Sequence, residues 1–108
     1  MQGKTMKKIF VCSPYRGDIS KNRAAAMGHC MEIIRHGDMP LAPHLYFTQF
    51  LVEENPKDRE KGISMGLELM LHCDRMHVYG TPTEGMKREI AHWKRCRNEK
   101  YILYFEEM

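Results

Sequence analysis

The stretch Lys8-Ile-Phe-Val-Cys-Ser-Pro-Tyr-Arg-Gly-Asp18 decides the fold, because a buried strand in it runs directly into a polar turn. The run from Lys8 to Ser13 is apolar without alternation, which is typical of a strand covered on both faces. From Ile19 the apolar spacing becomes helical, and Gly37 is placed to end that helix in a left-handed conformation. A buried strand followed by a long helix predicts a crossover to a parallel neighbour.

The rest of the chain continues this alternation. The predicted elements are a short strand over Met39 to Ala42, a short helix over Leu45 to Leu51, a helix over Pro56 to His72, a strand over Asp74 to Gly80, a helix over about Thr83 to Arg97 and a strand over Tyr101 to Phe105. Pro40 cannot donate to a ladder, which puts the second strand at an edge. We therefore predict an α/β fold: a three-layer doubly wound sandwich with a mostly parallel four-stranded sheet in the order 2-1-3-4.

Residues at helical spacing predict which faces of the helices are buried. For the first helix these residues are Met27, Cys30, Met31 and Ile34, and for the second long helix Ile63, Leu67, Met70 and Leu71. In the last helix they are Met86, Ile90 and Trp93. No repeat or linker divides the chain, so residues 1–108 are expected to form a single domain.

Composition and charge exclude several classes of protein. The chain is 43% hydrophobic and 29% charged, as a soluble globular protein is, and its net charge of +3 is small. No apolar run is long enough for a signal peptide or a membrane span, so we expect a cytoplasmic protein without a membrane partner. The basic residues Lys87, Arg88, Lys94 and Arg95 fit a solvated helix face, and nucleic acid is not an expected partner.

Cysteine spacing gives no metal motif. The cysteines are spread singly, and only His92 and Cys96 lie four apart on one predicted helix. Because no second pair matches this spacing, we expect neither a metal nor a cofactor.

A ligand site is expected where the winding of the sheet reverses, beyond the carboxyl ends of the first and third strands. The chain delivers two loops to that point, from Ser13 to Asp18 and from Gly80 to Gly85. The second loop leads into a helix N-terminus, whose free N–H groups favour an anion.

Two glutamates near the start of the last helix have different interpretations. Glu84 follows Thr81 by three residues, which is typical of a capping box. Glu89 falls on the flank of the apolar stripe and has no basic residue four positions away, since those neighbours are Gly85 and Trp93. On spacing alone, Glu89 is either a boundary carboxylate that reaches water or a functional group.

Three motifs carry a resemblance to a known family. They are Ser-Pro-Tyr-Arg-Gly from Ser13, Ala-Pro-His-Leu-Tyr-Phe over Ala42 to Phe47, and Thr-Glu-Gly-Met-x-x-Glu-Ile over Thr83 to Ile90. Over about residues 7 to 105 the chain resembles a small bacterial and phage family known as a domain of unknown function. That family is similar in turn to the nucleoside 2-deoxyribosyltransferases and the deoxynucleoside-monophosphate N-glycosidases.

The resemblance implies an activity and its residues. It maps the nucleophilic glutamate of those enzymes onto Glu89 and a catalytic aromatic residue onto Tyr15. The expected substrate-binding residues are Ser13, Arg16, Gly17, His44, Gly80, Thr83, Glu84, Gly85 and Met86. It implies a nucleoside or nucleotide as small-molecule partner, and a homo-oligomer, because small members of the superfamily often complete their sites across a dimer. A nucleophilic carboxylate must be ionised, and helix dipoles or Arg16 are expected to hold its pKa down.

Several alternatives stay open. The enzymes have a second carboxylate at a position that aligns near Gly66, and Glu60 is either its substitute or a plain surface residue. The function is accordingly an N-glycosidase or deoxyribosyltransferase or, alternatively, a non-catalytic nucleotide-binding protein. His44 and Tyr46 either line the pocket or pack under a helix, and Arg16 either pairs a phosphate or bonds Asp18.

Overall fold

The first strand lies in the middle of the sheet, as its apolar run predicts. In the computed structural model, which describes residues 5–106, β1 (Lys8–Cys12) pairs in parallel with both β2 (Met39–Leu41) and β3 (Arg75–Tyr79). β4 (Ile102–Phe105) pairs in parallel with β3. The predicted order 2-1-3-4 is confirmed, with β2 at one edge and β4 at the other.

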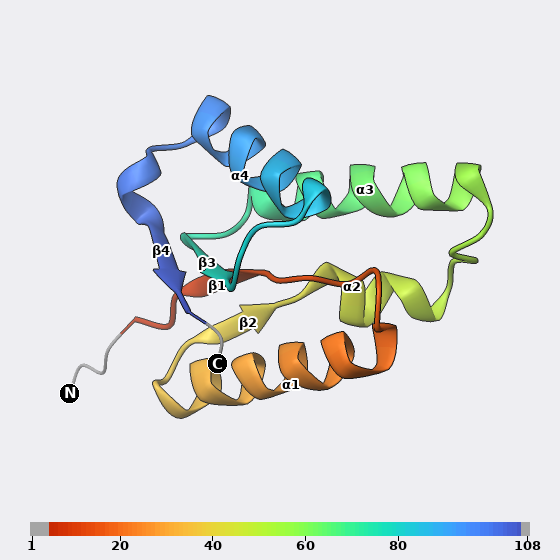
Figure 1. Ribbon diagram of the computed structural model, residues 1–108. Coiled ribbons are helices and arrows are strands. Elements are labelled where there is room, and N and C mark those ends of the chain that lie inside the picture. The colour runs from red at the N-terminus through yellow and green to blue at the C-terminus, as the bar shows by residue number, and fades with distance from the viewer. Residues whose placement is uncertain (1–4, 107–108) are drawn as a thin grey trace.

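Helices cover both faces of this sheet. They are α1 (Ile19–Arg35), α2 (Pro43–Tyr46), α3 (Pro56–Met70) and α4 (Glu84–Cys96), with 3-10 turns η1 (Phe47–Gln49) and η2 (Glu99–Tyr101). Figure 1 shows α1 on one face of the sheet and α3 and α4 on the other, an arrangement compatible with the predicted three-layer sandwich. Among the described residues, no helix is both long and apolar enough to cross a bilayer.

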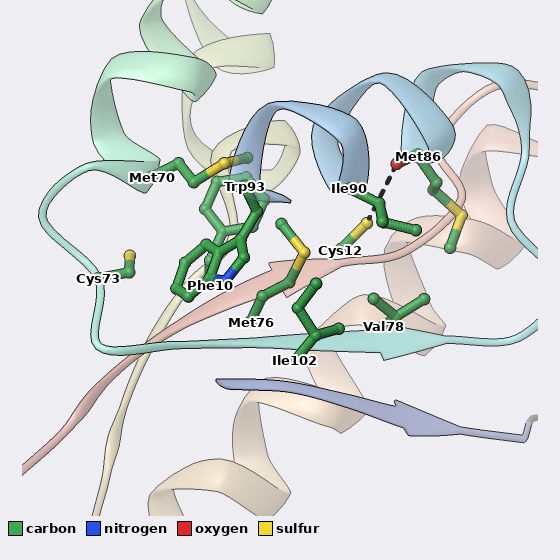
Figure 2. Close-up of a cluster of buried hydrophobic side chains, with 10 residues drawn as sticks. All are labelled: Phe10, Cys12, Met70, Cys73, Met76, Val78, Met86, Ile90, Trp93 and Ile102. Atoms are coloured by element: carbon green, nitrogen blue, oxygen red, sulfur yellow. Dashed lines mark hydrogen bonds between the residues drawn. The ribbon is translucent and has the colours of Figure 1, made fainter. Parts of the chain in front are cut away.

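The larger part of the core lies between the sheet and α3 and α4 (Figure 2). The predicted stripe of α4 is confirmed, because Met86, Ile90 and Trp93 are all buried there. On α3 only Met70 of the predicted stripe is fully buried, and Leu71 is exposed because the helix ends one residue before it.

The predicted buried face of α1 is wrong for three of its four residues, and only Cys30 packs half-buried against the core. Met27, Met31 and Ile34 are each more than half exposed, at 54%, 53% and 59%. Ala26 and Ile33 are buried instead, and Ile33 clusters with side chains of the sheet. The two series are about 100° apart on the helix, since neighbouring residues differ by that rotation. The helix therefore packs on the sheet through the face that carries Ile33, and the neighbouring methionines are left in contact with solvent.

Short turns lead from α1 into β2 and from α3 into β3, and the first has the glycine that the sequence predicts. Gly37 follows α1 with a positive φ of 89°, which a residue with a side chain rarely adopts. Asp74 is a turn residue, because the N–H of Lys8 donates to its carboxylate over 2.8 Å. The short helix predicted from Leu45 instead begins at Pro43, which occupies a first-turn position that suits proline.

Candidate functional site

A cleft of about 830 Å³ opens at the carboxyl ends of β1 and β3, within the size range of small-molecule sites. Every predicted site residue except Gly80 lines it: Ser13, Tyr15, Arg16, Gly17, His44, Thr83, Glu84, Gly85, Met86 and Glu89. Gly80 closes β3 instead, and its N–H donates to the carbonyl of Phe105 over 2.8 Å. The loops from both strands and one side of α3 therefore meet around a shared space.

The loop after β1 is held in place by the first turn of α1. The carboxylate of Asp18 caps this helix by accepting from the N–H of Lys21 over 3.1 Å. The alternative pairing of Arg16 with Asp18 is wrong, because the Arg16 guanidinium donates to Glu53. One turn later the amide of Asn22 donates to the carbonyls of Tyr15 and Arg16, over 3.1 and 3.0 Å. These bonds fix the backbone that carries two of the predicted site residues.

Ser13, Tyr15 and His44 lie together on one wall of the cleft. The Ser13 hydroxyl and Nε2 of His44 are 3.2 Å apart, and the rings of His44 and Tyr15 have centroids 5.7 Å apart. Burial lowers the pKa of His44 to about 4, so the imidazole is neutral at pH 7. His44 and Tyr46 were each expected either to line the pocket or to pack under a helix. His44 lines the cleft, whereas Tyr46 lies outside it and is 59% exposed.

The N-terminus of α4 forms a second wall. Thr83 is the N-cap, and its hydroxyl accepts from the N–H of Met86 over 3.3 Å. The predicted capping box of Thr81 and Glu84 is therefore wrong, because the helix begins two residues later than that box requires. Glu84 instead extends into solvent, with its carboxylate 3.7 Å from the ammonium of Lys87.

Glu89 places a carboxyl group in the cleft beside the core. Burial raises its pKa to about 7, and a hydrogen bond with the Cys12 thiol partly offsets this rise. The expectation that Arg16 holds this pKa down is wrong, because the Arg16 guanidinium donates to Glu53 over 2.9 Å. The Glu89 carboxyl is consequently divided between its two protonation states near pH 7.

Cys12 connects this carboxyl to the core. Its sulfur lies 3.9 Å from the carbonyl oxygen of Met86, beneath the first turn of α4 (Figure 2). Burial, followed by the charge of Glu89, raises the pKa of the thiol far above its usual range, so it stays protonated and can donate. In the sequence, Cys12 is one apolar residue of a buried strand, and no local pattern indicates this role.

Gly66, which the resemblance aligns near a second carboxylate, is a buried glycine of α3. An added Cβ there would lie 3.7 Å from the ring of Pro43 at the start of α2. Glu60, the candidate substitute, does line the cleft, although its side chain is exposed. The 3.7 Å distance to Pro43 is an ordinary van der Waals contact, so the packing of α2 on α3 would also accept alanine at position 66.

Arg59 is a cleft residue that the sequence analysis missed. Its Nε is buried and has no hydrogen-bond acceptor within residues 5–106. One face of α3 lines the cleft, and its residues follow helical spacing: Arg59, Ile63, Gly66 and Leu67. From spacing alone, the apolar side chains of this face are predicted to lie in the core. Arg59 lies one helical turn before this apolar stripe, and that position is the sequence feature that could have identified it as a cleft residue.

The chain matches a family model but no curated protein. Residues 7–104 match the model of a family described as Domain of unknown function (DUF7768).

Proposed function

This chain belongs to the DUF7768 family, and we propose that its cleft binds a nucleoside or nucleotide and breaks the N-glycosidic bond with Glu89 as nucleophile. The observation that carries the proposal is the Glu89 carboxyl in the wall of a cleft that also holds Tyr15 and His44. The resemblance of the Gly85 to Glu89 segment to the deoxyribosyltransferases supports the same role. The activity is then hydrolysis of the bond or transfer of the sugar to another base.

The proposed reaction has two displacement steps. A Glu89 oxygen attacks the anomeric carbon, the bond from this carbon to the base nitrogen breaks, and its electron pair leaves with the base, which takes up a proton. Water or a second base then attacks the anomeric carbon of the glycosyl-enzyme, loses a proton and releases the Glu89 carboxylate. Tyr15 borders the position of the sugar, and the Ser13–His44 pair offers polar contacts to it.

The raised pKa of Glu89 gives this mechanism a pH signature. Only the ionised carboxylate attacks, and burial raises the pKa to about 7 in the free protein. We expect kcat/KM to increase with pH through about 7 and to level off above it. Glu60, which lines the cleft, is the candidate substitute for the second carboxylate of the enzymes that the chain resembles.

Release of free base from a panel of nucleosides and 5′-nucleotides, followed by chromatography, tests the proposal. Glu89→Gln is expected to lower the rate by at least about 10³-fold, because the amide cannot form the glycosyl ester. Glu68→Gln is the control, since Glu68 is exposed on α3 outside the cleft and pairs with His72. An unchanged rate in Glu89→Gln would show that the assigned nucleophile is wrong.

A second candidate function is non-catalytic binding of a nucleotide. Gly66 favours it, because no side chain there supplies the acid that the related enzymes use. A nucleotide that raises the melting temperature and is recovered intact after long incubation supports binding alone. Release of base under the same conditions contradicts it.

A further inference from the structure

The cleft is long, and its ends carry different groups. Its lining on α3 extends from Pro56 to Leu67, which is about 16 Å at the helical rise of ~1.5 Å per residue. Leu67 also packs against the core cluster that contains Met86, so this end of the groove lies at α4. Arg59 lies eight residues before Leu67, about 12 Å along the helix axis. A ligand that fills the groove from α4 to Arg59 presents a further group beyond its sugar.

The Arg59 end has a buried donor atom without an acceptor. The Nε of Arg59 is buried and has no acceptor in the described part of the chain. A guanidinium cannot discard its charge by losing a proton at physiological pH. Buried donors without a partner are uncommon and costly. Because the Arg59 side chain is half-buried and lines the cleft, a rotation that brings its guanidinium to an acceptor on a ligand would remove this cost.

A second guanidinium is held near this end. The N–H of Val52 donates to the carboxylate of Asp58 over 2.8 Å, which ties the segment before α3 to the helix next to Arg59. The following residue, Glu53, accepts from Arg16 over 2.9 Å. The side chains of this pair are 62% and 28% exposed, and exposed ion pairs contribute little free energy, so an incoming anion can displace Glu53 from Arg16.

We propose that Arg16 and Arg59 form a phosphate subsite at this end of the cleft, so that the ligand is a phosphorylated nucleoside. The planar fork of a guanidinium matches two phosphate oxygens, and such charge-assisted bonds are the strong ones. The nucleoside part of this assignment rests on the proposed function. The phosphate part rests on the two guanidinium groups, and it places the phosphate away from the N-terminus of α4.

Calorimetric titration in the Glu89→Gln background tests the subsite without consuming the ligand. The probes are the 2′-deoxynucleosides, their 5′-monophosphates and inorganic pyrophosphate. We expect each monophosphate that binds to do so at least about tenfold more tightly than its nucleoside, as hydrogen bonds to charged groups predict. Arg59→Gln is expected to remove this preference. Lys61→Gln, an equal charge change on the exposed side of the same helix, is expected to keep it.

The outcomes separate this proposal from the proposed function. Equal affinity for nucleosides and monophosphates, a preference that survives Arg59→Gln, or no binding of any phosphate compound overturns the subsite. Pyrophosphate binding that requires Arg59, without binding of any nucleoside or nucleotide, supports the subsite and contradicts the proposed function. If Arg59→Gln does not fold by circular dichroism, Arg59→Lys takes its place, because it keeps the charge, loses the fork and should weaken the preference.

Discussion

The two ends of the cleft handle a buried ionisable group in opposite ways. At the α4 end, the Glu89 carboxyl lies beside the core and its pKa rises to about 7. At the far end of the groove, the Arg59 guanidinium has a buried Nε without an acceptor in residues 5–106. Both groups border the same cleft, and neither has an opposite charge as its partner within the described chain.

This difference comes from what each group can do with its charge. A carboxyl group that loses water contacts can bind a proton and become neutral, and its hydrogen bond with Cys12 remains possible in both states. A guanidinium stays charged in any protein environment. The charge at the Glu89 end therefore depends on pH, whereas the charge at the Arg59 end can be balanced only by an anion that binds there.

The largest expected effect concerns the stability of the Glu89 end as a function of pH. The folded pKa of about 7 exceeds the ordinary value of 4.5, so the folded state binds more protons between these limits. The free energy of unfolding must then fall as pH rises through this window, by about 3 kcal/mol in total at ~1.4 kcal/mol per unit. Glu89→Gln should remove this loss and exceed the wild type in stability at pH 8 by a similar amount. Urea unfolding at several pH values measures it.

His44 requires this measurement to be a difference between proteins. Its folded pKa of about 4 lies below the ordinary value of 6.5, so it contributes stability that is lost as pH falls through that range. In the wild type, Glu89 and His44 therefore change the free energy of unfolding with pH in opposite directions. The contribution of Glu89 is obtained by subtracting the pH curve of Glu89→Gln from that of the wild type. Glu68→Gln should reproduce the wild-type curve. A difference curve that stays flat from pH 5 to pH 8 contradicts the assigned burial.

Arg59→Met is the matching test at the other end. Methionine keeps an apolar stem and removes the unpaired donor, so the ligand-free protein should gain about 1 kcal/mol of unfolding free energy. Arg16→Met is the control, and it should lower the free energy of unfolding instead of raising it. It removes the exposed ion pair with Glu53, so the loss should be less than about 1 kcal/mol. Thermal and urea unfolding at pH 7 measure both. A loss of more than about 1 kcal/mol in Arg59→Met would show that the guanidinium already has a stabilising partner.

How well the sequence predicted the molecule depends on the range of the interaction involved. The sheet order and the meeting of Tyr15 with Glu89 at one cleft follow from parallel topology, because carboxyl ends of neighbouring strands share an edge. The buried face of α1 did not follow, since Met27 and Ile34 extend the apolar pattern round the helix and the helix packs on the sheet through Ile33 instead. Periodicity identifies a helix more securely than it identifies which of two adjacent apolar stripes is buried.

The electrostatic state of the site was outside the reach of sequence. The partner of Arg16 comes from a segment 37 residues away, and no local pattern indicates that Glu53 folds onto it. The pKa of Glu89 depends on burial beside Cys12, which pairs a strand with a helix across the core. Such values require the positions of side chains that meet only in the folded chain.

A smaller effect sharpens the account of Glu89 itself. Cys12→Ala removes the thiol that lowers the pKa of this carboxyl, so the midpoint of its titration should rise by about half a unit to one unit, the worth of one hydrogen bond. Cys73→Ala is the matched control, because Cys73 is also buried, and its thiol donates to the carbonyl of Leu69 over 3.5 Å. Carbon-13 NMR of labelled glutamate side chains measures the midpoint. Equal midpoints in Cys12→Ala and Cys73→Ala would contradict the thiol contact.

The smallest effect tests whether the two guanidinium groups at the phosphate end are equally available. Glu53 occupies Arg16 in the ligand-free protein, so an anion must displace this carboxylate before Arg16 can bind it. Glu53→Gln should therefore raise the affinity for pyrophosphate by about two- to fivefold, since exposed ion pairs contribute less than ~1 kcal/mol. Glu54→Gln, an equal charge change at the next residue outside the cleft lining, should leave the affinity within error. A decrease in Glu53→Gln would mean that the carboxylate positions Arg16 for the anion instead of competing with it, and the Arg16–Glu53 pair would then belong to the subsite as a unit.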